Sequence, residues 1–167
     1  MPNITVEEIF NISKTALSQH GALDWVAEEV AEAVAASESV GNRICGLYYL
    51  ESYCEQLISG RVNGKAYPEV NLARSSSIYV DAKDGFAQPA FSKGLPEVLK
   101  VAQENGIASL SVGRAHTCTS LGFFTKKNSK SWIFGFRIHE CFPNCCPSRR
   151  QISNYRDKPN RLFSTRW

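Results

Sequence analysis

Apolar residues recur at helical spacing in three stretches of the first 58 residues. The first stretch begins at Thr5-Val6-Glu7-Glu8, which fits a capping box, and it ends at Gly21. The second, Asp24–Ser39, has valines and alanines on one face and glutamates on the other. The third covers Leu47–Ile58. This order predicts a layer of three helices at the N-terminus.

A different pattern follows the turn-forming residues 59–64. Ser77–Asp81 alternates between polar and apolar residues like a strand, and residues 106–112 form an apolar run typical of a buried strand. Between them Ala87–Asn105 has helical spacing, although Pro96 lies inside it and is expected to restart the helix. Strand, helix and strand in this order predict a βαβ unit, so the fold class is α/β.

The charge changes abruptly near residue 126. Residues 1–125 carry a net charge of −5, whereas residues 126–167 carry +8. No apolar run reaches the length of roughly 18 residues that a membrane span needs, and residues 1–21 do not resemble a signal peptide. We therefore expect a cytoplasmic protein without a membrane partner. In that compartment six cysteines do not indicate disulfides.

The basic tail offers two candidate sites, and neither is favoured. His139, Cys141, Cys145 and Cys146 include zinc-ligand types, but the paired spacing of a zinc finger is missing. The tail arginines could contact nucleic acid, yet basic tails of this kind are more often simply solvated. We therefore expect no metal and no nucleic acid. After Lys127 the pattern fits neither a helix nor a hairpin, so the C-terminal quarter is expected to be irregular.

Several ordered segments resemble one known family. They include Leu-Ile-Ser-Gly-Arg-Val-Asn-Gly at residues 57–64 and Val-Asp-Ala-Lys-Asp-Gly-Phe-Ala-Gln at residues 80–88. The remaining segments are residues 46–50, 68–70, 105–108 and 116–122. In this order and spacing they resemble the malate/L-lactate dehydrogenase family, which is distinct from the Rossmann lactate dehydrogenases and includes Δ1-pyrroline-2-carboxylate reductase.

The resemblance implies an NAD- or NADP-dependent oxidoreductase. A hydride would pass between the nicotinamide and a small 2-oxo acid, 2-hydroxy acid or cyclic imino acid such as pyrroline-2-carboxylate. In this family a Ser-His pair before a glycine supplies acid/base chemistry, and a later arginine binds the substrate carboxylate. The first cofactor-binding loop corresponds here to His116, Thr117, Cys118, Thr119 and Ser120. Family members are usually homodimers.

This chain departs from the family pattern at the catalytic positions. Alignment on Gly46 places Ile44 and Cys45 where the family has Ser and His, and Tyr49 where it has the arginine. Cys45 is therefore the candidate catalytic residue and Tyr49 the candidate substrate ligand. A thiol with an ordinary pKa near 8.5 suits proton transfer at neutral pH less well than imidazole. Either this branch uses a different acid, or the chain has lost catalytic competence.

The tail gains a family motif when it is read in another frame. With the first base dropped, codons permitted for residues 156–161 read Gly-Thr-Asn-Pro-Ile-Ala, which is the family's next motif. The same shift gives Thr-Asn-Ala-Ser-Pro from residues 139–143. We therefore expect a frameshift near residue 127, which would make the chain a truncated copy of the oxidoreductase. The alternative is an inactive frameshifted remnant or a non-enzymatic interaction fragment.

These inferences divide the chain into three parts. Residues 1–75 are expected to form the helical N-terminal region, and residues 76–127 part of a cofactor-binding α/β region with a mixed sheet. Residues 128–167 are expected to be an out-of-frame tail without a native fold.

Overall fold

The computed structural model describes residues 4–116 and 118–129. Over these residues five α-helices, one short 3-10 helix and three strands follow one another along the chain. They are α1 Val6–Gln19, α2 Asp24–Ser39, η1 Arg43–Cys45, α3 Leu47–Ile58, β1 Glu69–Arg74, β2 Ser77–Asp81, α4 Ala87–Asn105, β3 Ser109–Gly113 and α5 Leu121–Ser129. The α/β class is confirmed. The expected tail, the His139 and Cys141 cluster and Thr117 lie outside the described residues.

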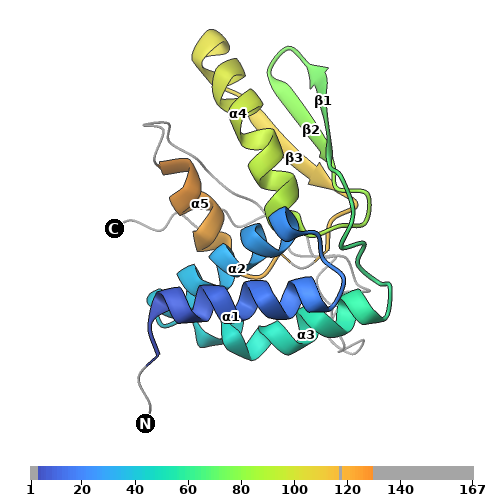
Figure 1. Ribbon diagram of the computed structural model, residues 1–167. Coiled ribbons are helices and arrows are strands. Elements are labelled where there is room, and N and C mark those ends of the chain that lie inside the picture. The colour runs from blue at the N-terminus through green and yellow to red at the C-terminus, as the bar shows by residue number, and fades with distance from the viewer. Residues whose placement is uncertain (1–3, 117, 130–167) are drawn as a thin grey trace, which may run out of the picture. The chain divides into compact units, whose positions relative to one another are not determined.

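The three N-terminal helices form one layer, as the apolar pattern predicts (Figure 1). The capping box is present at α1, where the Thr5 hydroxyl accepts a hydrogen bond from the Glu8 amide at 3.1 Å. The Glu8 carboxylate in turn accepts one from the Thr5 amide at 2.7 Å. Buried apolar side chains of α1, α2 and α3 pack into one cluster, which includes Leu17, Val26, Val30 and Tyr53.

The sheet is mixed and has the strand order β1-β2-β3. β1 pairs with β2 in antiparallel fashion, whereas β2 and β3 are parallel and joined by α4. This arrangement confirms the expected βαβ unit, although the second strand covers Ser109–Gly113 rather than residues 106–112. Ile78 and Val80 of β2 are buried in the cluster that also contains Ala90 and Val101 of α4. α4 therefore covers one face of the sheet (Figure 1).

η1, β1 and α5 were not predicted, and one expected break does not occur. β1 lies within the region expected to be helical, and α5 follows the candidate cofactor loop. The expectation that Pro96 restarts the helix is wrong, because α4 runs without interruption through it. The ring removes only one backbone donor, and the rest of a 19-residue helix packed on the sheet outweighs that loss.

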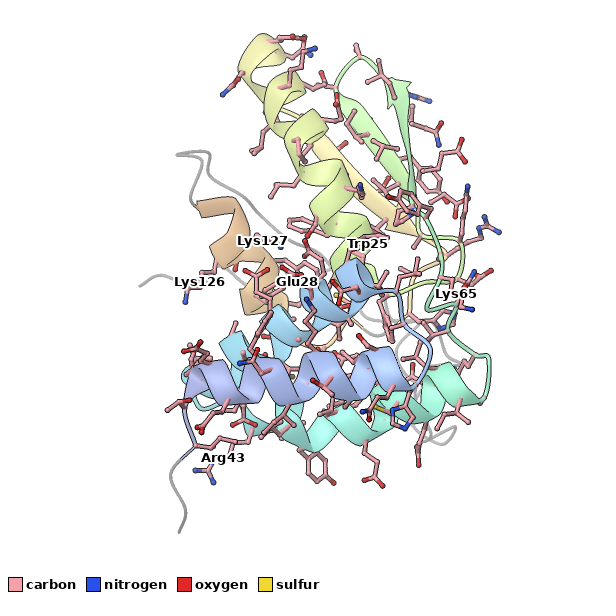
Figure 2. The ribbon with its side chains drawn as sticks, viewed as in Figure 1. Trp25, Glu28, Arg43, Lys65, Lys126 and Lys127 are labelled. Carbon is pink, nitrogen blue, oxygen red and sulfur yellow. The ribbon has the colours of Figure 1, made fainter. Side chains whose placement is uncertain are left out.

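α5 is anchored to the helices by aromatic and charged side chains. Phe123 and Phe124 are buried, and the Phe124 ring lies edge-on to Phe91 of α4 with 5.0 Å between ring centroids. Lys127 points from α5 towards α2, where its ammonium lies 2.6 Å from Glu29 and 2.9 Å from Glu32 (Figure 2). The chain therefore packs regularly up to the position at which its charge changes.

Candidate active site

The candidate catalytic position lies in the turn between η1 and α3. Glu38 at the end of α2 reaches this turn, and its carboxylate accepts a hydrogen bond from the Leu47 amide at 2.8 Å. Leu47 opens α3, so Glu38 satisfies a donor that a helix N-terminus leaves unpaired. A Cβ atom at Gly46 would lie 2.6 Å from the Glu38 carboxyl carbon, which is closer than packed atoms approach. The absence of a side chain at Gly46 thus lets Glu38 hold the turn that carries Cys45.

Cys45 and Tyr49 are both half-buried at this end of α3. Their neighbours Ile44 and Tyr48 are 72% and 79% exposed, so large apolar groups flank the position on the outside. Tyr49 turns inward, and its ring lies edge-on to that of Tyr53 with 5.2 Å between centroids. The structure therefore places both predicted residues on one short stretch of chain beside Tyr53.

Tyr53 is a buried polar residue that the sequence pattern placed in an apolar stripe. Its hydroxyl lies 2.8 Å from the Thr119 hydroxyl and accepts a hydrogen bond from the Gln88 amide nitrogen at 3.3 Å. The Gln88 donor leaves the Tyr53 proton available for Thr119. Burial raises the pKa of the Tyr53 hydroxyl well above its ordinary value, so the group stays neutral. Tyr53 thus joins α3 to the loop that follows β3.

The candidate cofactor loop begins at the carboxyl end of β3. Its first half is held by backbone hydrogen bonds to the segment before α4, because the His116 amide donates to Gly85 at 2.8 Å. The His116 carbonyl accepts from the Ala87 amide at 3.0 Å. Cys118 packs against the cluster that contains Phe91 and Phe124.

The second half of the loop leads into α5 and carries two hydroxyl side chains. Thr119 and Ser120 carry hydroxyls directly before the first turn of the helix. Helix N-termini favour phosphate, since their backbone amides are unpaired and the helix dipole is positive there. A Cβ atom at Gly122 would meet nothing nearer than the Ser120 hydroxyl at 4.0 Å, so the first turn is open. Residues 114–129 contain no acidic side chain. The described part of the loop therefore has features that favour an anionic group such as a phosphate.

The predicted residues are brought together only in part. Tyr49 is linked to the loop through Tyr53 and Thr119, whereas His116 is bonded to the start of α4 through its backbone. Tyr53 and Gln88 were missed, because a hydroxyl whose partner lies 66 positions away leaves no local signal. Glu38 was missed because its bond to the Leu47 amide, nine residues further along, depends on the folded turn between them.

The described residues, 4–116 and 118–129, offer neither a metal centre nor a membrane-spanning helix. No group of three or more His, Cys, Asp or Glu side chains there could hold a metal ion. In the same part of the chain, none of the helices combines the length and the apolar character that crossing a bilayer demands.

The sequence and fold were compared with those of known proteins. The family model for malate/L-lactate dehydrogenase matches residues 4–149. A Δ1-pyrroline-2-carboxylate/Δ1-piperideine-2-carboxylate reductase from Pseudomonas syringae pv. tomato is 29% identical over 118 residues, which are 71% of this chain and 34% of the relative. A (2R)-3-sulfolactate dehydrogenase (NADP+) from Chromohalobacter salexigens is 34% identical over 113 residues, 68% of this chain and 34% of the relative.

The fold comparison agrees with the sequence comparison. The crystal structure of Δ1-piperideine-2-carboxylate reductase from Pseudomonas syringae pv. tomato superposes with a TM-score of 0.73 at 27% identity, over 76% of this chain and 38% of that one. The malate dehydrogenase of Pyrococcus horikoshii OT3 has the same fold, with a TM-score of 0.71 at 19% identity. The chain spans about a third of the length of these relatives. Because the family model covers most of its residues, the chain belongs to the malate/L-lactate dehydrogenase family.

Proposed function

We propose that this chain provides the substrate-facing helix and the first cofactor loop of an NAD(P)-dependent oxidoreductase. Its substrate would be a small 2-oxo acid, 2-hydroxy acid or cyclic imino acid, with pyrroline-2-carboxylate favoured by the relatives. One observation carries the proposal. The hydrogen bond between Tyr53 and Thr119 joins α3, which bears Tyr49 and directly follows the turn after Cys45, to the predicted cofactor loop.

Each residue has a defined part in this proposal. When bound, the nicotinamide donates or accepts the hydride. Thr119 and Ser120 would bind the dinucleotide, and Cys45 would hold or release the substrate proton where relatives have histidine. Tyr49 would donate a hydrogen bond to the substrate carboxylate. A neutral hydroxyl forms a weaker bond to a carboxylate than a guanidinium does, so weak substrate binding is expected.

The test uses the purified 167-residue chain. Titration with NADH and with NADPH, followed by nicotinamide fluorescence, should show binding, and Thr119→Val should weaken it. Nicotinamide absorbance is then followed with pyrroline-2-carboxylate, pyruvate and oxaloacetate. Cys45→His should raise any turnover, because imidazole titrates near neutral pH. Failure of the wild-type chain to bind either dinucleotide would contradict the proposal.

A second candidate is an inactive frameshifted remnant. It is favoured by the two family motifs that a one-base shift gives from residues 139–143 and 156–161. The chain keeps regular packing through Lys127, the position at which we place the shift. The family match extends to residue 149, however, which is beyond that position. Sequencing the DNA past the Trp167 codon separates the two candidates. A stop codon soon after this point in the shifted frame would exclude the frameshifted remnant.

The cellular setting of the protein also stays a prediction. We expect a cytoplasmic homodimer, because subunits of this family usually pair. Light scattering of the purified chain against its mass of 18.6 kDa tests the dimer.

A further inference from the structure

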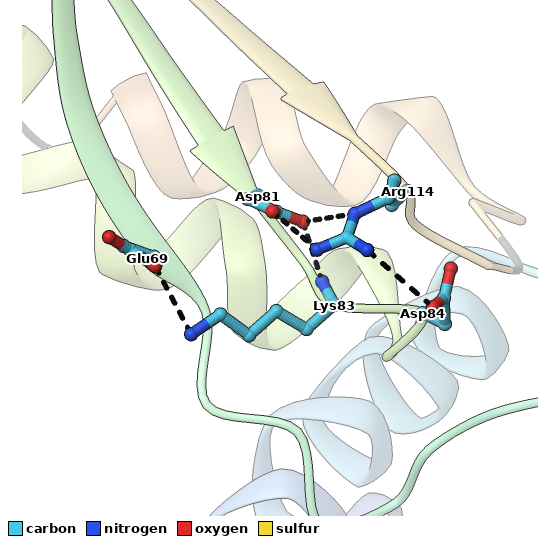
Figure 3. Close-up of polar contacts among 5 residues, drawn as sticks. All are labelled: Glu69, Asp81, Lys83, Asp84 and Arg114. Carbon is cyan, nitrogen blue, oxygen red and sulfur yellow. Dashed lines mark hydrogen bonds and ion pairs between the residues drawn. The ribbon is translucent and has the colours of Figure 1, made fainter.

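An ion pair joins the carboxyl ends of the two parallel strands next to the cofactor loop. Asp81 is the last residue of β2, and Arg114 directly follows β3 (Figure 3). The Arg114 guanidinium donates two hydrogen bonds to the Asp81 carboxylate, from Nε to Oδ1 at 2.8 Å and from Nη2 to Oδ2 at 2.5 Å. The Asp81 side chain is 20% exposed and the Arg114 side chain 54%, so the carboxylate is shielded from water while the guanidinium lies at the surface.

The same carboxylate holds two backbone segments in an unusual conformation. Arg114 has a φ of 48°, and Lys83 and Asp84 have φ values of 51° and 60°. Side chains make this left-handed conformation unfavourable, so it persists only where surrounding contacts enforce it. Asp81 supplies such contacts on both sides, because its Oδ1 also accepts a hydrogen bond from the Lys83 amide at 2.9 Å (Figure 3).

These segments are the entry to the cofactor loop. The Asp84 amide donates to the Arg114 carbonyl at 2.9 Å, and the His116 amide donates to Gly85 two residues further on. At its other end the loop is fixed by the bond between Thr119 and Tyr53. The direction in which the chain leaves β3 at Arg114 therefore sets the path by which Thr119 reaches Tyr53.

We propose that Asp81 and Arg114 are positioning residues that fix the 114–120 loop for the dinucleotide. This inference rests on the proposed function. Asp81 acts on the loop through Arg114 and through Lys83. Neither Asp81 nor Arg114 needs to contact the cofactor. A glycine at position 114 would adopt the left-handed backbone without strain but would lose the ion pair. This difference allows the positioning role to be separated from a stabilising one.

The first measurement is hydrogen exchange in the full chain without cofactor. In Arg114→Gly the amides of Asp84 and His116, which donate to the Arg114 and Gly85 carbonyls, should exchange at least tenfold faster, while α1–α3 and the melting temperature stay unchanged. Asp81→Asn should act in the same direction, and Arg114→Lys should give a smaller increase because it cannot form both bonds. Glu69→Gln is the matched control, since it removes the neighbouring ion pair with Lys83 at 3.1 Å. Unchanged loop exchange, or an increase no larger than that of the helices, would overturn the inference.

The second measurement is the dissociation constant for NADPH, read from its fluorescence. Arg114→Gly should raise this constant at least tenfold and Glu69→Gln should leave it unchanged. Equal constants for wild type and Arg114→Gly would overturn the inference. If the wild-type chain binds no dinucleotide, the proposed function fails, and the exchange measurement still decides whether Asp81 and Arg114 position the loop.

Discussion

The hydroxyl groups of Tyr53 and Thr119 lie 2.8 Å apart and join α3 to the loop after β3. This contact connects the helical layer with the βαβ unit, which the sequence predicts as two separate regions. Gln88, at the start of α4, donates to the same Tyr53 hydroxyl, so three elements meet at one buried oxygen. A polar group in such a position is stabilising only while its partners remain in place.

Tyr53→Phe tests this junction directly. Loss of the hydroxyl leaves the Thr119 and Gln88 groups short of a partner, so the free energy of unfolding should fall by about 1–2 kcal/mol. Thr119→Val should cost a similar amount, and the double variant should lose about 1 kcal/mol less than the sum. Urea denaturation gives all three values. Tyr48→Phe is the control, because the Tyr48 side chain is 79% exposed. Fully additive losses would show that the two hydroxyls do not interact.

The same residue should make the protein sensitive to alkali. Burial raises the pKa of Tyr53 above its ordinary value of 10.0. Above that pH the unfolded chain releases the proton while the folded chain keeps it, so stability is complete below pH 10 and is lost as the pH rises. Tyr53→Phe should flatten the alkaline limb of a plot of melting temperature against pH. The melting temperature should still fall slightly with rising pH because of Lys127. Burial lowers the pKa of this lysine, but its bonds to Glu29 and Glu32 outweigh that effect, so its pKa is raised overall.

The contrast between elements that could and could not be predicted has a physical origin. α2 and α3 were predicted with their observed bounds because each buries one continuous stripe against its neighbours. β1 was missed because the alternation of its polar and apolar residues covers only Glu69–Leu72, and only Val70 of its six residues is even half-buried. α5 was missed because it is short and its buried residues Phe123 and Phe124 are adjacent, so they form no helical stripe.

The candidate site shows the same limit. His116, Thr119 and Ser120 were found through resemblance to a family motif, and Thr119 was then placed in contact with Tyr53 by the fold. Tyr53 could not be found in this way, because its partner Thr119 lies in a distant element. Glu38 could not be found because its bond to the Leu47 amide depends on how the turn between α2 and α3 folds. Local patterns report local burial, whereas a site assembled from three elements depends on the tertiary structure.

Gly46→Ala should weaken the turn that carries Cys45. The new methyl group would displace the Glu38 carboxylate from the Leu47 amide and remove a helix cap worth about 1 kcal/mol. Glu38→Ala should cost about the same. In a chain that already carries Glu38→Ala, Gly46→Ala should therefore lower the stability less than it does in the wild type. Thermal unfolding of the four proteins checks this, and an undiminished effect in the double variant would contradict the role of Glu38.

Lys127→Met should detach α5 from the helical layer. Its ammonium is paired with Glu29 and Glu32 and lies 5.4 Å from the Phe123 ring centroid, with the side chain 20% exposed. Methionine keeps the apolar stem but leaves two carboxylates close together without their cation, so the free energy of unfolding should fall by about 1–2 kcal/mol.

The matched control for this variant is Lys100→Met, which changes an exposed lysine on α4 and should alter stability by less than about 0.5 kcal/mol. Hydrogen exchange should rise in α5 more than in α1 under Lys127→Met, because only α5 loses its attachment. Equal effects of the two variants would show that Lys127 does not hold α5, and the regular packing of the chain would then end before the position at which its charge changes.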